Sequence, residues 1–336
     1  MTEKKRWGII GASAIARDWV IPALQAEGQD LVAVLSSEAE RGKAFARDCG
    51  IERASTDIGD IVNDDDIDCV YISTTNELHK PHAIAAANGG KHVLCEKPLA
   101  LELADVDAMI AAADTAGVVF ATNHHMRGSG LHRKLKELIG SGAIGKVNSV
   151  RLFHAGYLPE HLQTWRLTHP EKGGGVALDL GVHDADTLRN ILGEEPVEVT
   201  GLSAGRGMAQ AGLDDTAMFV LRMQSGILAI VHESFVEKHA GPSRIEVMGT
   251  EGSLVATGAM AQAPGGALTL RRGDAVELID TDRNSLYAYT IAMFVAAIEN
   301  GGAPLVSGRD GRRSLEIALA AEAACRGETR VSIPPL

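Results

Sequence analysis

The hydrophobic pattern of the chain changes character near its middle. Up to about residue 123, short apolar runs rich in β-branched residues alternate with stretches of helical periodicity. The expected strands are residues 7–11, 31–35, 69–73, 92–95 and 118–122, and the expected helices are residues 14–27, 38–48, 77–88 and 103–116. This alternation predicts a parallel sheet with helices on both faces, because parallel neighbours need a crossover connection.

The second half of the chain is richer in strands. A helix expected over residues 129–139 precedes strands at 146–153, 197–202, 216–223, 226–235, 244–249 and 252–256, several of them joined by tight turns that suit antiparallel neighbours. Helices expected over 285–300 and 308–326 close the chain. We therefore predict an α/β protein with a doubly wound Rossmann domain over 1–123. An α+β domain with a mostly antiparallel sheet is expected over 124–336; its last helices could pack back on the first domain, and the ligand crevice is expected between the two.

Composition narrows the possible partners. The 336 residues suit two domains, and the formal charge of −12 opposes general attraction to nucleic acid or to an anionic membrane. No apolar run approaches the roughly 20 residues that span a bilayer, and the N-terminus lacks the apolar region of a secretory signal. We therefore expect a cytoplasmic protein, with neither nucleic acid nor membrane as a partner.

A glycine turn follows the first expected strand. Gly11 and Ala16 fit the first and third positions of the dinucleotide fingerprint, and Ser13 replaces the middle glycine. The alternative is that Gly11 merely ends a strand and Ser13 caps a helix.

The end of the second expected strand distinguishes between dinucleotides. An acidic residue there usually binds a free ribose 2′-hydroxyl, whereas a 2′-phosphate needs small hydroxylated residues and an arginine. Ser36 with Arg41 therefore favours NADP(H). Two alternatives stay open: Ser37 and Glu40 could form a capping box with Arg41 solvated, or Glu38 could hold a ribose.

The segment from Ser73 to His79 follows the third expected strand. Its threonine and asparagine side chains can hydrogen-bond a ribose or a nicotinamide amide, and capping of the next helix by Thr75 or Asn76 is compatible with this role. His79 and His82 could share a helix face, but nothing is spaced to complete a metal site with them. We expect no metal.

Lys97 is the first candidate catalytic group. It follows the expected strand 92–95, at the carboxyl end where open α/β sheets bind ligands, and Pro98 restricts its backbone to extended angles. The alternative is an exposed lysine in an ordinary turn.

The second candidate group follows the three glycines at 173–175. Asp179 and His183 are four residues apart, so on one helix they share a face. Imidazole titrates near neutrality and can protonate a carbonyl oxygen as hydride arrives, and Asp179 could orient it or bind a substrate hydroxyl. The alternative makes Asp179 an N-cap and His183 a hydrogen-bonded core residue.

These motifs, in this order, resemble the Gfo/Idh/MocA family of sugar and polyol oxidoreductases over essentially the whole chain. The supporting strings are Gly11-Ala-Ser-Ala-Ile-Ala-Arg17, Ser73-Thr-Thr-Asn-Glu-Leu-His79, Cys95-Glu-Lys-Pro-Leu99, Thr122-Asn-His-His125, Phe153-His-Ala-Gly-Tyr-Leu-Pro-Glu-His-Leu-Gln163 and Asp179-Leu-Gly-Val-His183. Gly156 departs from the bulkier residue expected in the branch that the chain resembles most, which leaves the exact sugar open.

The resemblance implies a catalytic role for Lys97 and His183, with Asp179 in the same site. It implies dinucleotide contacts from Ala12, Ser13, Ala14, Ile15, Ser36, Ser37, Arg41, Thr74, Thr75, Asn76, His79, Glu96, Lys97, Asn123, Trp165, Arg166 and Tyr287, beside the turn at Gly11.

The activity that it implies is reduction of a cyclic keto sugar by NADPH, with 1,5-anhydro-D-fructose as the expected substrate and 1,5-anhydro-D-mannitol as the product. The alternatives are NAD(P)-dependent oxidation of a sugar or a polyol such as inositol, and a non-catalytic sensor of dinucleotide or sugar. A monomer and a homo-oligomer are both compatible with the sequence.

Overall fold

The structure, a computed structural model, describes residues 4–210, 212–327 and 329–335. This part of the chain divides into two compact units. The first contains residues up to His125 together with Tyr287–Arg312, and the second contains Met126–Leu286 and the residues from Arg313 onward. Residues 287–312 thus belong to the first unit, although the sequence analysis assigned them to the C-terminal domain. The chain returns from the first unit to the second between Arg312 and Arg313, inside the last helix.

Within the first unit, six described strands form a parallel sheet in the order β3-β2-β1-β4-β5-β6. The strands are β1 Arg6–Ile10, β2 Asp30–Leu35, β3 Arg53–Ser55, β4 Cys69–Ile72, β5 His92–Cys95 and β6 Phe120–Thr122. Sequence analysis missed β3, because three half-buried residues give no periodic signal.

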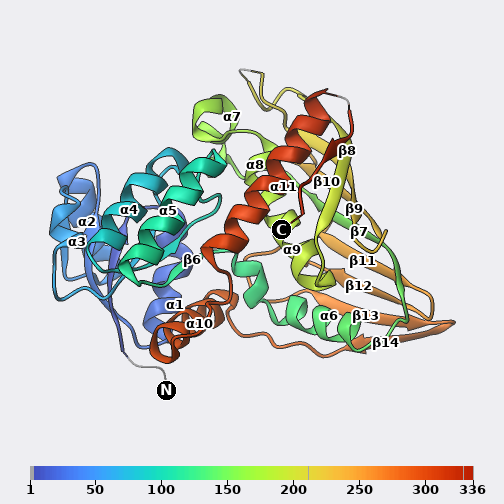
Figure 1. The fold of residues 1–336 in the computed structure, drawn as a ribbon, viewed down its shortest axis with the longest axis horizontal. Helices are drawn as coiled ribbons and strands as arrows, with labels where there is room; N and C mark the ends of the chain where they lie inside the picture. The colour runs from blue at the N-terminus through green and yellow to red at the C-terminus, as the bar shows by residue number, and fades with distance from the viewer. Residues whose placement is uncertain (1–3, 211, 328, 336) are drawn as a thin grey trace. The chain divides into compact units, whose positions relative to one another are not determined.

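Helices follow the strands as the crossover rule requires. They are a π-helix Ala16–Val20 continuing into α1 Ile21–Ala26, then α2 Ala39–Cys49, α3 Gly59–Val62, a 3₁₀ turn Asn76–Leu78, α4 His79–Asn88, α5 Leu103–Ala116 and α10 Leu286–Asn300. Figure 1 shows α4 and α5 side by side. The ring of Phe294 on α10 lies 5.5 Å from that of Trp7 on β1, measured between centroids. This contact fixes α10 on the first unit although it lies about 290 residues further along the chain.

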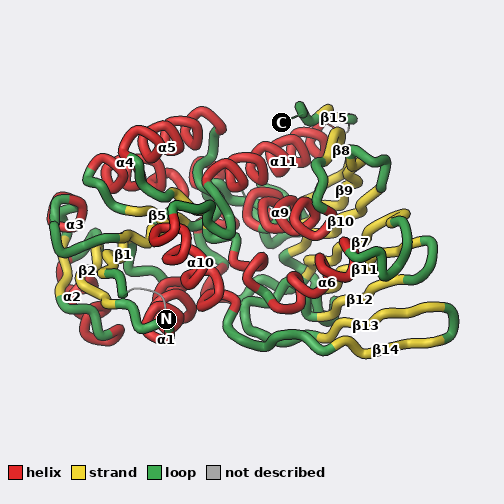
Figure 2. Tube along the Cα trace, turned by 60° about the horizontal axis from the view of Figure 1, so that its bottom comes forward, coloured by secondary structure: helices red, strands yellow, loops and turns green. Residues whose placement is uncertain are grey.

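The second unit is built on a sheet of nine described strands in the order β14-β13-β12-β11-β7-β10-β9-β8-β15. Only β7 and β10, among the described strands of this sheet, pair in parallel. Figure 2 shows the hairpin of β13 and β14 at one edge of this sheet. The strands are β7 Val147–Ala155, β8 Pro196–Ala204, β9 Thr216–Met223, β10 Leu228–Ser234, β11 Arg244–Gly249, β12 Ser253–Thr257, β13 Ala267–Arg272, β14 Ala275–Ile279 and β15 Val331–Ser332. The predicted fold class, a Rossmann domain plus a domain with a mostly antiparallel sheet, is confirmed.

Of the helices after β6 in the chain, α6, α8 and α9 contact the second sheet. All of them except α10, which was given above, are named here. They are a 3₁₀ turn His125–Gly128, α6 Gly130–Gly140, a 3₁₀ turn Glu160–Leu162, α7 Trp165–Thr168, a 3₁₀ turn Pro170–Lys172, α8 Val176–Asp179, α9 Gly181–Leu192 and α11 Gly308–Gly327. Sequence analysis did not predict β13, β14, β15 or the short helix α7.

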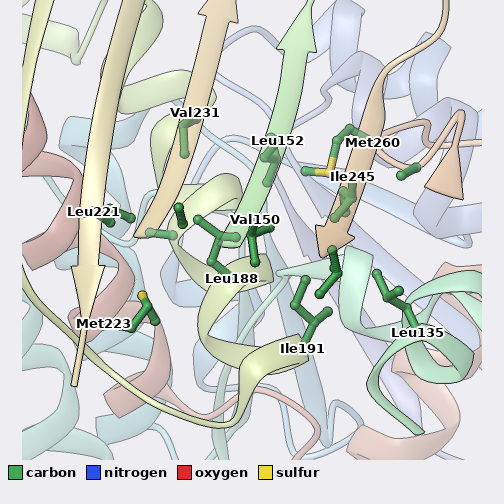
Figure 3. Packing of buried hydrophobic residues seen from close by; sticks show 14 of the residues in the cluster. Leu135, Val150, Leu152, Leu188, Ile191, Leu221, Met223, Val231, Ile245 and Met260 are labelled. Atoms are coloured by element: carbon green, nitrogen blue, oxygen red, sulfur yellow. The ribbon is translucent and has the colours of Figure 1, made fainter. Parts of the chain in front are cut away.

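The core of the second unit lies between α9 and the sheet. Figure 3 shows Leu188 and Ile191 of α9 packed against Val150 and Leu152 of β7. Strand β9 alternates buried and more exposed positions, so Phe219, Leu221 and Met223 face this core while Met218 and Val220 lie on the opposite face. Helix α9, which carries His183, is therefore held by burial of its apolar stripe. Among the described helices, none has both the length and the apolar character to cross a bilayer.

Candidate active site

Gly11 brings the turn after β1 close to the end of β4. Its φ is +111°, and a Cβ built there would lie 2.9 Å from the carbonyl carbon of Ser73 and 3.0 Å from the amide nitrogen of Thr74. Both the backbone angle and the close approach require glycine. The turn is therefore built as the first position of a dinucleotide fingerprint demands.

Ser13 has a structural role within this turn. Its hydroxyl accepts a hydrogen bond from the amide of Ala16 at 3.1 Å and donates to the hydroxyl of Ser73 at 2.8 Å. The helix-capping alternative is thus realised. Ala12, Ala14 and Ile15 beside it remain partly or fully exposed at the start of the helix, where backbone N–H groups attract phosphate. Their contacts with a cofactor stay a prediction.

The end of β2 carries hydroxyl groups and an available arginine. Ser36 is buried, and its hydroxyl accepts a 3.4 Å hydrogen bond from the amide of Glu38. Ser37 and Arg41 are exposed, and Arg41 forms no ion pair within the described residues. A guanidinium and small hydroxyl groups near a strand end are the groups that a 2′-phosphate needs, and the preference for NADP(H) stays a prediction.

The capping-box alternative is wrong. Helix α2 begins at Ala39 with Glu38 as its N-cap, and no side-chain capping bond is found there among the described residues. Glu40 instead pairs with Lys43 at 2.8 Å. The alternative role of Glu38, holding a ribose, stays open.

The loop after β4 is held by side-chain hydrogen bonds within the loop and to the helix that follows it. Thr75 donates to Glu77 at 2.7 Å, and the hydroxyl of Thr74 lies 3.3 Å from Nδ1 of His82, while Asn76 is buried in the 3₁₀ turn. Neither Thr75 nor Asn76 is found to cap the next helix by a side-chain bond in the described part of the chain.

His79 links this loop to the segment after β5. Its ring nitrogens lie 2.9 Å from the carbonyl oxygen of Pro98 and 3.1 Å from that of Thr74. Burial lowers the pKa of His79 to about 4, against the opposing effect of the two carbonyl groups. A neutral ring donates to only one of them. His79 therefore supports the turn at Lys97, and a direct contact with a cofactor stays a prediction.

Glu96 forms the support beneath Lys97. Its Oε1 accepts hydrogen bonds from the Tyr71 hydroxyl at 2.6 Å and from Nδ2 of Asn123 at 2.5 Å, and its Oε2 accepts from the Lys97 amide at 3.3 Å. Burial raises the pKa of Glu96, although the hydrogen bonds from Tyr71 and Asn123 lower it. The Lys97–Pro98 peptide bond is cis, and the side chain of Lys97 is partly exposed. Glu96 and Asn123 thus hold Lys97 at the carboxyl end of β5, and the dinucleotide contacts that the resemblance implies for both residues stay a prediction.

Tyr287 stands in a stack of rings within the first unit. Its ring lies 4.5 Å from that of His125 and 5.8 Å from that of Trp19, in near-parallel orientation. The dinucleotide contact that the resemblance implies for Tyr287 stays a prediction, and sequence reasoning missed Trp19 and His125 as neighbours of this ring. Three positions this far apart in the sequence carry no local signal of contact.

In the second unit, the glycine loop packs against α7. Gly175 has a φ of +103°, and its amide donates to the carbonyl of Arg166 at 2.8 Å. A Cβ at Gly174 would lie 3.0 Å from the carbonyl oxygens of Arg166 and His169. The loop thereby brings three predicted residues together: Nε of Arg166 donates to Oδ2 of Asp179 at 3.1 Å, and the guanidinium lies 4.7 Å from the centroid of the Trp165 ring.

Asp179 and His183 do not lie on one helix. Asp179 ends α8, and His183 lies in the first turn of α9, which starts at Gly181 with Leu180 as its N-cap. Asp179 is not an N-cap, since that of α8 is Gly175. The side chain of Asp179 is 12% exposed and His183 is 6% exposed, so both are nearly enclosed.

Sequence reasoning missed three polar residues near His183. The ring of His154 on β7 lies 6.4 Å from that of His183, edge to face, and its Nδ1 bonds Oδ1 of Asp184 at 2.8 Å. Glu233 on β10 is fully buried beside Asp184. The signal was available, since Glu233 interrupts an apolar strand and Asp184 directly follows His183.

The first unit thus has a Rossmann sheet with a glycine turn, and the second has a carboxylate and an imidazole on an antiparallel scaffold. These features define a class, the dinucleotide-dependent oxidoreductases with a separate second domain. Residues 5–124 match the model of an oxidoreductase family with an NAD-binding Rossmann fold, and residues 132–255 match the GFO/IDH/MocA C-terminal domain.

Three relatives extend the match over the whole chain. The chain is 48% identical to 1,5-anhydro-D-fructose reductase of Ensifer adhaerens, covering 96% of this chain and 97% of that protein. It is 31% identical to myo-inositol 2-dehydrogenase of Thermotoga maritima, covering 94% and 95%. The crystal structure of aldose-aldose oxidoreductase from Caulobacter crescentus, complexed with glycerol, matches with a TM-score of 0.90 at 28% identity and covers 98% of this chain and all of that one. The chain therefore belongs to the Gfo/Idh/MocA family, and the resemblance found in its sequence is confirmed.

Proposed function

We propose that this protein reduces a cyclic keto sugar with NADPH, and that 1,5-anhydro-D-fructose, reduced at its C2 ketone, is the substrate. The observation that carries the proposal is the 48% identity with the 1,5-anhydro-D-fructose reductase of Ensifer adhaerens, which extends over nearly the full length of both chains. The resemblance extends to the residues at which the chemistry is expected, Lys97, Asp179 and His183.

Each of these residues has a proposed task. NADPH, when bound, supplies the hydride. The ammonium of Lys97, supported by Glu96, stabilises the negative charge that develops on the carbonyl oxygen. His183 delivers the proton that completes the alcohol, and Asp179, paired with Arg166, binds a sugar hydroxyl or orients the imidazole.

A substrate screen tests this proposal. Keto sugars and polyols would be offered with NADPH, NADH, NADP⁺ and NAD⁺, and we expect the highest kcat/KM for anhydrofructose with NADPH. Oxidation of myo-inositol with NAD⁺ as the best reaction would instead favour a function like that of the second relative. Tight dinucleotide binding without turnover of any compound would point to a sensor.

Preference for NADPH is expected to depend on Arg41. The Arg41→Ala variant removes one charge-assisted contact to the 2′-phosphate, so we expect KM for NADPH to rise about tenfold or more while KM for NADH stays within about twofold. Arg47→Ala is the matched control, because Arg47 lies on the same helix and pairs with its neighbour Asp48. Equal changes for both dinucleotides in Arg41→Ala would argue against a phosphate pocket at this strand end.

A further inference from the structure

Three ionisable side chains that the proposed chemistry does not use meet in the second unit. Strands β7 and β10 pair in parallel with His154 opposite Glu233, so these two side chains point to the same face of the sheet. Helix α9 covers that face: a Cβ built at Gly181 would lie 3.2 Å from Oε1 of Glu233. Asp184, one turn further along α9, completes the cluster.

The hydrogen bonds of this cluster leave one proton to be assigned. Asp184 and Glu233 are both 0% exposed. Nδ1 of His154 lies 2.8 Å from Oδ1 of Asp184, within hydrogen-bond distance. Within the described residues, no N–H or hydroxyl group donates to Oδ2 of Asp184 or to either carboxyl oxygen of Glu233. Glu233 lies opposite His154 and against Gly181 of α9, three residues before Asp184, so the two carboxyl groups are neighbours. Two neighbouring buried carboxyl groups, three of whose oxygen atoms receive no hydrogen bond, cannot both be ionised, so one of the two must carry a proton.

The surroundings assign that proton to Glu233. Burial, followed by the negative charge of Asp184, raises the pKa of Glu233 well above its usual range, and Cys325 of α11 and Asp179 of α8 act in the same direction. Asp184 differs because it also accepts a hydrogen bond from His154. His132 of α6, the other imidazole in this neighbourhood, is itself buried, and burial lowers its pKa to about 4. It therefore adds no positive charge near neutral pH.

We propose that Glu233 is a positioning residue for proton transfer: it stays protonated, donates to Asp184, and thereby lets Asp184 hold His154 with Nδ1–H fixed beside His183. The pair of carboxyl groups then carries a single negative charge, which faces the His154 ring. The His154 ring, held in this way, lies 6.4 Å from the ring of His183 between centroids and fixes the surroundings of that imidazole.

The proton balance follows from this arrangement. Reduction leaves an alkoxide that takes one proton from an imidazolium, and the imidazole regains a proton from solvent. The proton between Glu233 and Asp184 is not consumed. The proposed function supplies only the identity of the reaction, so the protonation of Glu233 can be tested without substrate.

Infrared spectroscopy of the intact protein tests the protonation of Glu233 directly. In D₂O near neutral pD, we expect the C=O stretching band of a buried carboxylic acid in the wild type and its loss in Glu233→Gln. The amide of glutamine has nearly the same shape and still donates to Asp184, so this variant is expected to fold. Absence of the band in the wild type, or its persistence in the variant, would overturn the proposal.

Imidazole NMR spectroscopy tests the connection to His154. We expect a downfield Nδ1–H signal of His154 in the wild type and its loss in Asp184→Asn, because the ring loses the carboxylate that accepts this hydrogen. Glu246→Gln is the control, since Glu246 pairs with Arg244 and Arg151 and its loss removes the same charge from this sheet. An equal effect in both variants, or none in Asp184→Asn, would contradict the positioning role.

The pH dependence of thermal stability tests the protonation of Glu233 even if the protein turns over none of the sugars in the screen. The raised pKa means that folded Glu233 keeps its proton at pH values where the unfolded chain has lost it, so stability falls as pH rises above the ordinary pKa of glutamate. Glu233→Gln lacks this titration. We expect the Tm of the variant, relative to wild type, to rise steadily from about pH 5 to pH 9. A pH-independent difference would refute a protonated Glu233, whereas failure of the sugar screen alone would refute only the proposed reaction.

Discussion

The Lys97→Met and His183→Ala variants are each expected to lower kcat for keto-sugar reduction by about a hundredfold or more. Methionine keeps most of the length of lysine without its charge, so it removes stabilisation of the developing alkoxide. Alanine at 183 removes the proposed proton donor. The Kd of NADPH for His183→Ala, measured by fluorescence titration, is expected to differ from that of the wild type by less than about threefold. A proton donor acts mainly in the transition state and contributes little to cofactor binding.

Matched control variants distinguish the loss of a catalytic group from a general loss of folding or activity. Lys80→Met removes a half-exposed lysine that pairs with Asp105 on the surface of the first unit. His239→Ala removes an exposed histidine of the second unit. Both are expected to retain near-normal turnover. If Lys97→Met and His183→Ala behave like these controls, the assignment of the reaction to the two residues is wrong.

The Arg127→Met variant is expected to lose about 3 kcal/mol of unfolding free energy. The guanidinium of Arg127 binds the carboxylate of Asp186 through two hydrogen bonds, at 2.9 Å and 2.6 Å. The side chain of Asp186 is only 1% exposed, so removing the arginine leaves a buried charge with the weaker contacts of Ser314 at 3.3 Å and Arg189 at 3.9 Å. Urea unfolding followed by circular dichroism measures the loss.

Lys134→Met is the control for this measurement. Lys134 and Glu137 form an ion pair on the surface of α6, where solvent screens the charges, so its loss is expected to cost less than about 1 kcal/mol. Because Asp186 lies three residues after His183 on α9, we also expect Arg127→Met to reduce kcat at temperatures where the variant is still folded. A loss of stability no larger than that of Lys134→Met would show that the Arg127 pair contributes little.

The sequence was most informative where function depends on the end of a strand. Gly11 and Lys97 were found because each directly follows a short apolar run, and the carboxyl ends of parallel strands share one edge of the sheet. The same reasoning placed Ser36 at the end of β2. This reasoning did not exclude a capping box at Ser37 and Glu40. Capping depends on the residue at which the helix begins, and a periodic pattern fixes the start of a helix only to within a few residues.

The sequence by itself therefore determined the Rossmann half, the strand-rich second half, the family and the residues at strand ends, since all of these follow from local periodicity or from motifs read along the chain. Only the tertiary structure joined Tyr287 to Trp19 and His125, separated Asp179 from His183 by the break between α8 and α9, and brought Glu233 against Asp184. The physical reason is that such contacts depend on strand register, helix placement and burial, which are set by packing between segments far apart in the chain.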